Sequence, residues 1–172
     1  ELDTGTYTVE VTDNATGVTV ESTEITVNEA DDEEASFANN VITEQRGDIL
    51  GATVEMTETS EATLTFGSDD DGVVANATVE DDDGDDEVTV YINTYRLDSG
   101  VGGDVFSVDS DSDDSVLAEN LESGTDDLVD AGDYDLEVQS GDQGVGTGQG
   151  VTESDDVATV TLEERSTDTP RT

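Results

Sequence analysis

The sequence contains no cysteine, no histidine, no lysine and no tryptophan. Without cysteine and histidine, disulfides, zinc sites and the common nucleophile–base pairs are excluded. Only 4 cationic residues remain, all arginine, so the chain cannot neutralise phosphates and we expect no nucleic-acid partner. No apolar run approaches the roughly 20 residues of a membrane span, so we expect no direct membrane insertion by this segment.

Acidic residues dominate what is present. Aspartate and glutamate total 47, which gives a formal net charge of -43. In dilute salt such repulsion favours a disordered acidic tail. At about 1 M salt the Debye length falls to roughly 3 Å, and a folded protein tolerates the same charge. Because the apolar residues are regularly patterned, we predict a folded halophilic protein that loosens or unfolds in low salt.

Alternating apolar residues predict an N-terminal β-hairpin over residues 1–28. Tyr7, Val9 and Val11 share one face, and a turn-like segment at 13–17 separates them from a second alternating run. The acidic residues 29–35 have no apolar period and are predicted to form a connector. The hairpin is interpreted either as the end of a preceding immunoglobulin-like unit or as a segment that donates strands to a neighbouring copy.

Residues 36–165 are predicted to form an all-β, immunoglobulin-like antiparallel β-sandwich of about seven strands. Alternating runs recur between clusters of glycine and aspartate, which favour turns. One or two helical turns are expected over 115–121, capped by Asp113 and Asp114. The polar residues 166–172 are expected to be a linker or tail.

A short motif occurs twice, as Asp3-Thr4-Gly5-Thr6-Tyr7 and as Asp130-Ala131-Gly132-Asp133-Tyr134. Each copy precedes an alternating strand. In immunoglobulin-like sandwiches this pattern is typical of the tyrosine corner, in which the tyrosine hydroxyl bonds to nearby backbone. We therefore predict structural tyrosine corners at Tyr7 and Tyr134, although a simple Asp-Gly turn explains either copy alone.

Four segments together resemble domains of haloarchaeal S-layer-like cell-surface glycoproteins: Phe37 to Asp48, Tyr91 to Tyr95, Asp130 to Leu136 and Thr161 to Arg165. The resemblance covers most of residues 36–165. It implies an exported, glycosylated, immunoglobulin-like envelope module at the cell surface. It carries over no catalytic residues.

Two N-glycosylation sequons begin at Asn14 and Asn76. Asn14 lies in a predicted turn, whereas Asn76 lies in a predicted strand and must point outward to accept a glycan. Among the aspartate clusters, Asp81, Asp83 and Asp85 are the candidate metal ligands, for Ca²⁺ or a monovalent cation. A solvated acidic surface explains the same cluster without specific binding. Arg46-Gly47-Asp48 is interpreted as a turn, with Arg46 in a local ion pair.

We expect no catalytic residues, no cofactor other than Ca²⁺, and a structural role at the extracellular surface. A carboxylate-pair glycosidase is disfavoured because the aromatic residues that usually line sugar sites are scarce. The expected partners are other copies or neighbouring domains of the same surface protein, together with solvent cations. The alternatives are a cation-dependent adhesin or ligand-binding domain, and a viral or pilus-like filament subunit assembled by strand donation.

Overall fold

The computed structural model describes residues 5–27 and 33–165, so the predicted tail 166–172 and most of the predicted connector lie outside the described residues. Residue contacts divide the chain into unit 1, residues 1–32, and unit 2, residues 33–172. Each unit is described by itself.

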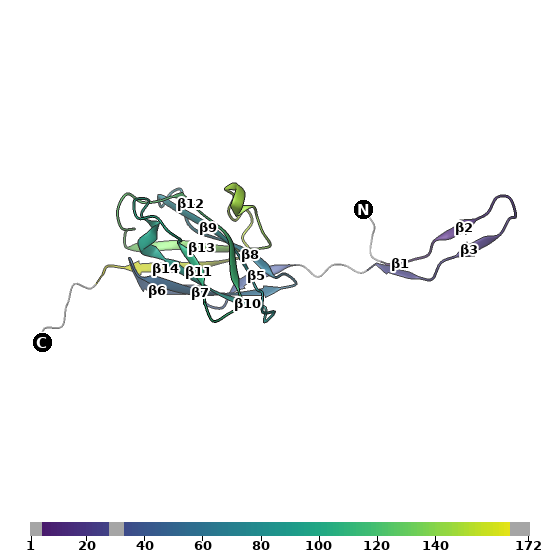
Figure 1. Ribbon diagram of the computed structural model, residues 1–172, viewed down its shortest axis with the longest axis horizontal. Coiled ribbons are helices and arrows are strands. Elements are labelled where there is room, and N and C mark those ends of the chain that lie inside the picture. The colour runs from purple at the N-terminus through teal and green to yellow at the C-terminus, as the bar shows by residue number, and fades with distance from the viewer. Residues whose placement is uncertain (1–4, 28–32, 166–172) are drawn as a thin grey trace, which may run out of the picture. The chain divides into compact units, whose positions relative to one another are not determined.

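Unit 1 is a long antiparallel hairpin (Figure 1). Strand β1 (Gly5–Tyr7) pairs with β4 (Ile25–Val27), and β2 (Glu10–Thr12) pairs with β3 (Thr19–Glu21). The turn closes where the Gly17 amide donates to the Asp13 carbonyl at 2.7 Å, with Gly17 at a φ of 70° that favours glycine.

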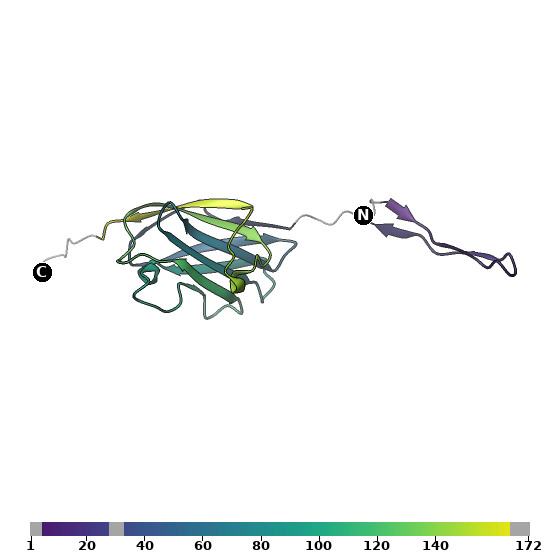
Figure 2. The same cartoon turned by 90° about the horizontal axis from the view of Figure 1, so that it is seen from above.

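Unit 2 consists of two sheets packed as a sandwich (Figures 1 and 2). The four-stranded sheet has the order β11 (Phe106–Val108), β10 (Glu87–Asn93), β7 (Ile49–Thr57), β5 (Glu34–Phe37). The six-stranded sheet has the order β12 (Ser115–Ser123), β9 (Val73–Glu80), β8 (Glu61–Ser68), β13 (Gly132–Ser140), β14 (Asp156–Glu163), β6 (Val41–Gln45). Two short 3-10 helices, η1 (Thr94–Leu97) and η2 (Val145–Thr147), lie in connections. The all-β prediction is confirmed, with four plus six strands where about seven were expected.

The pairing is antiparallel except between β6 and β14, which run parallel. The chain reaches this position by crossing from one sheet to the other between β5 and β6. Carboxylates at the start of β14 hold that crossing, because Asp156 Oδ2 accepts from the Phe37 amide at 2.9 Å and Asp155 Oδ2 accepts from the Ala35 amide at 3.2 Å. Asn40 also donates to Asp156 at 2.9 Å.

The immunoglobulin-like assignment stays a prediction. In variable-type sandwiches the two strands added at the edge of the larger sheet follow each other directly along the chain. The corresponding edge strands of the six-stranded sheet are β9 and β12, and here β10 and β11 of the facing sheet come between them in the chain.

The helical turns expected over 115–121 are wrong, because this segment is strand β12, paired with β9. The register shifts between Val116 and Ala118 and again between Leu121 and Ser123. Such bulges place successive apolar residues out of strict alternation, which imitates a helical spacing.

The core of unit 2 lies between the sheets and consists of the alternating residues that the sequence pattern predicts. Leu50, Val54, Leu64, Phe66 and Leu136 are fully or almost fully buried. The rings of Phe66 and Tyr134 stack with centroids 5.4 Å apart. Within the described residues, no helix is long and apolar enough to cross a membrane.

Candidate functional site

The loop from Asp81 to Asp86 carries the chain from β9 to β10, and so from one sheet to the other. It is closed by Asp81, whose side chain accepts from the Gly84 amide at 2.7 Å and from the Asp86 amide at 2.8 Å. This closure brings one carboxylate oxygen each from Asp81, Asp83 and Asp85 within 4.8 Å of one another. The structure thus brings together the three predicted ligands.

Asp114, which was expected to cap a helical turn and is not among the three predicted ligands, faces the same loop. Its Oδ1 is shielded from solvent and has no hydrogen-bond partner among the described residues. Burial raises the pKa of Asp114, and repulsion from Asp81 and Asp85 adds to the rise. Burial likewise raises the pKa of Asp83, with further repulsion from Asp85, Asp114 and Asp81. The side chains gathered at this loop are all carboxylates, and carboxylate oxygens are among the ligands that Ca²⁺ prefers.

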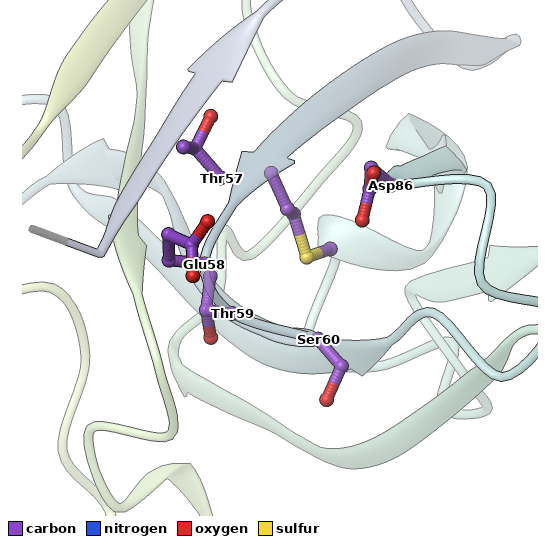
Figure 3. Close-up of a pocket in the computed structure, with 6 residues that line it drawn as sticks. Thr57, Glu58, Thr59, Ser60 and Asp86 are labelled. Atoms are coloured by element: carbon purple, nitrogen blue, oxygen red, sulfur yellow. The ribbon is translucent and has the colours of Figure 1, made fainter. Parts of the chain in front are cut away.

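An open hollow of about 480 Å³ lies beside this loop, at the turn between β7 and β8 (Figure 3). Glu58 and Asp86 lie on opposite sides of it, and both have positive φ, of 56° and 65°. Its other lining residues are Met56, Thr57, Thr59 and Ser60. The hollow is lined by two carboxylates and three hydroxyls, with no cationic side chain and no aromatic ring.

The glycine-rich segment 141–151 covers part of the outer face of the six-stranded sheet, and this covering was not predicted. Thr65 Oγ1 accepts from the Val151 amide at 2.8 Å, and Thr63 Oγ1 accepts from the Gln143 amide at 3.0 Å. Thr78 donates to Asp142 at 3.1 Å. Val145 in η2 is buried. Strand β9 is therefore buried on both faces.

Asn76 lies under this segment, and the expectation of an outward, accessible acceptor is wrong for this sequon. Its side chain is 0% exposed. Its Oδ1 accepts from Thr65 at 2.7 Å, and its amide nitrogen donates to Glu122 at 3.2 Å. Alternation does place Asn76 on the outer face of the sheet, but the glycine-rich segment covers it.

Asn14 is exposed in the turn of unit 1 between β2 and β3. It therefore has the accessibility that a glycan acceptor needs. Its modification stays a prediction.

Tyr134 has the geometry of a tyrosine corner. Its hydroxyl donates to the Asp130 carbonyl at 2.8 Å, four residues earlier. Burial raises the pKa of Tyr134, and the nearby carboxylates of Asp130 and Asp71 act in the same direction. For Tyr7 the equivalent acceptor is Asp3, which lies outside the described residues.

Two arginines form ion pairs that link the ends of β6 and β14. Arg46 bonds Glu164 at 2.9 Å and Arg165 bonds Asp48 at 3.2 Å. Asp48 closes the β6–β7 turn by donating its amide to Gln45 at 3.1 Å. The turn and the ion pair predicted for Arg46 are both confirmed.

The structure and composition define an acidic all-β module, and the comparisons agree. The chain belongs to the family described as the domain of unknown function DUF7827, which it matches over residues 27–141. It is 42% identical to a cell surface glycoprotein of Haloferax gibbonsii, over 99% of this chain and 19% of that protein. It is also 36% and 38% identical to cell surface glycoproteins 1 and 2 of Haloarcula hispanica, over 99% of this chain in each case.

The resemblance to haloarchaeal surface glycoproteins is confirmed by these matches. The chain spans about a fifth of the length of the curated relatives it matches. No solved structure matches it significantly.

Proposed function

We propose that this chain is a non-catalytic structural module of a haloarchaeal cell-surface protein, working as part of an S-layer-like lattice, a stalk or a filament. The observation that carries the proposal is the match along 99% of the chain to proteins named cell surface glycoproteins in two halophilic genera. The rigid two-sheet core supports a mechanical role. The acidic surface supports solubility in brine.

The location is tested by binding of an antibody against unit 2 to intact cells of the source organism. Labelling of intact cells is the expected result. Labelling only after lysis would contradict a surface role.

Assembly is tested by sedimentation velocity of the chain in molar NaCl, with calcium and then with chelator. Large assemblies support a lattice or filament. A monomer under every condition leaves a spacer or a ligand-binding domain, and rules out self-assembly by this segment.

A second candidate function is a calcium-dependent surface domain, favoured by the convergence of Asp81, Asp83 and Asp85 beside the unpartnered Oδ1 of Asp114. Burial and mutual repulsion raise the pKa values of Asp83 and Asp114, and a bound calcium ion would offset the repulsion. Micromolar to millimolar affinity spans the range of extracellular calcium modules and sensors.

Calorimetric titration with calcium in molar KCl measures this directly. The variant Asp83→Asn with Asp85→Asn is expected to weaken binding at least about tenfold, since two ligands lose their charge. Asp81 is left in place because it closes the loop. The matched control is Asp69→Asn with Asp70→Asn in the exposed turn between β8 and β9. Equal titrations of both variants would mean that the loop is only a solvated acidic surface.

A further inference from the structure

Unit 1 presents an apolar face on its β2–β3 pair. Val11 and Val20 are directly paired across β2 and β3, and each is 63% exposed. The large apolar side chains exposed in this unit are Val9, Val11, Val18, Val20 and Ile25. The opposite face carries paired polar residues such as Thr12 and Thr19, whose hydroxyls lie 3.2 Å apart. A two-stranded hairpin is barely stable alone in water, and an apolar face of this kind marks an interaction surface.

The start of this hairpin, at β1 and β4, matches the start of the β13–β14 hairpin that closes unit 2. Gly5 and Gly132 begin the two first strands with φ of 153° and 157°. Gly5 pairs with Val27 and Tyr7 with Ile25. In unit 2, Gly132 pairs with Leu162 and Tyr134 with Val160. The motif, the glycine conformation and the strand register therefore coincide from Gly5 to Tyr7. Beyond Tyr7 the register of unit 1 shifts by one residue, since Glu10 pairs with Glu21.

In unit 2 the equivalent face is covered. Its apolar residues are at most 7% exposed: Tyr134, Leu136, Val138, Ala158, Val160 and Leu162. Strand β8 flanks β13, strand β6 flanks β14, and the four-stranded sheet lies across the core. In the described part of unit 1, by contrast, the strands pair only with one another.

We propose that the apolar face of unit 1 docks onto an incomplete β-sandwich, built like unit 2 without its last two strands, and supplied by an earlier part of the same polypeptide. Unit 1 would then be the closing hairpin of that sandwich. The relatives support a docking partner within the same polypeptide, because about four-fifths of each relative lies outside the segment that matches this chain. The inference rests on the internal match and not on the cell-surface role, so either can fail alone.

Hydrogen exchange tests the docking. In molar salt and at concentrations where the 172-residue chain is monomeric, amides of β1 to β4 are expected to exchange close to the unprotected rate, while those of β8 and β13 stay protected. In the full-length Haloferax gibbonsii relative, the aligned hairpin is expected to be at least about 100-fold more protected than in the matched segment alone.

A matched pair of variants in that relative separates the two faces. Substituting aspartate at the two positions of the relative that align with Val11 and Val20 is expected to abolish the extra hydrogen-exchange protection of its hairpin. Aspartate at those aligned with Thr12 and Thr19 is expected to leave it in place. A hairpin protected in the isolated monomer, or unprotected in the full-length relative, would overturn the proposal. Protection that rises with concentration together with dimer formation would replace it with docking between copies.

Discussion

At the scale of single residues, Asn76 shows how a sequence motif and a structural role compete for the same side chain. Both of its polar groups are occupied, by Thr65 and Glu122. A buried polar group that loses its partners is expensive, so the asparagine is explained by this network without a glycan. Asn14, in an open turn, has no such constraint from burial.

We therefore expect Asn76→Asp to destabilise unit 2 by about 2–4 kcal/mol, because it replaces the amide that donates to Glu122 with a buried carboxylate facing that glutamate. Asn14→Asp is the control and is expected to change stability by less than about 0.5 kcal/mol. Urea unfolding followed by circular dichroism in molar KCl measures both. Mass spectrometry of the secreted protein should find any glycan at Asn14 and none at Asn76; a glycosylated Asn76 in folded protein would contradict the buried position.

At the scale of elements, the glycine-rich segment 141–151 is a cover that depends on close approach of backbone to side chains. A Cβ on Gly150 would collide with Asn76 Oδ1 and would lie 2.6 Å from Thr65 Oγ1. A Cβ on Gly146 in the same segment would meet nothing within 4 Å. The packing of the segment against the sheet therefore requires glycine at position 150 but not at position 146.

Gly150→Ala is expected to lift the segment and to destabilise unit 2 by about 1–3 kcal/mol, as overpacking usually does. Gly146→Ala should change stability by no more than about 0.5 kcal/mol. Urea unfolding compares the two variants, and hydrogen exchange at Val151 reports the cover itself. Equal stability of both would show that the segment does not press on the sheet.

At the scale of the whole molecule, charge repulsion opposes folding in dilute salt. Repulsion from Asp82 raises the pKa of Glu80, and burial raises the pKa of Glu119, with Asp104 adding repulsion. A folded pKa above the unfolded value means that the folded state binds protons more tightly, so stability is gained as pH falls. Asp156 is the opposite case: burial opposes its ionisation, but hydrogen bonds from Phe37, Asn40 and Val157 lower its pKa.

In low salt, unfolding free energy should therefore rise as pH falls from neutrality toward the ordinary values of 4.5 for glutamate and 3.8 for aspartate. Further acidification through the lowered pKa of Asp156 should remove stability again. In molar KCl, where the Debye length is about 3 Å, the gain should shrink. Urea unfolding at two salt concentrations across this pH range tests the prediction, and a loss of stability between neutrality and these values in low salt would contradict it.

The sequence predicts the core strands well because their alternation is local. Leu50, Ala52, Val54 and Met56 form one such alternating run, and all four are buried in β7. Strand β12 was missed because bulges break its period. The cover over Asn76 and the approach of Asp114 to the Asp81 loop join residues dozens of positions apart, and no local pattern records such contacts.

The parallel pairing of β6 with β14 determines how unit 2 responds to tension. The start of β5 and the end of β14, the first and last strands of this unit, lie at opposite ends of the sandwich (Figure 1). A pull between these ends acts along both strands and loads their hydrogen bonds in shear. The bonds from Thr159 to Glu163 must then break together and not one after another. The same five-residue ladder that fixes the edge of the sheet therefore makes the unit resistant to stretching along its polypeptide.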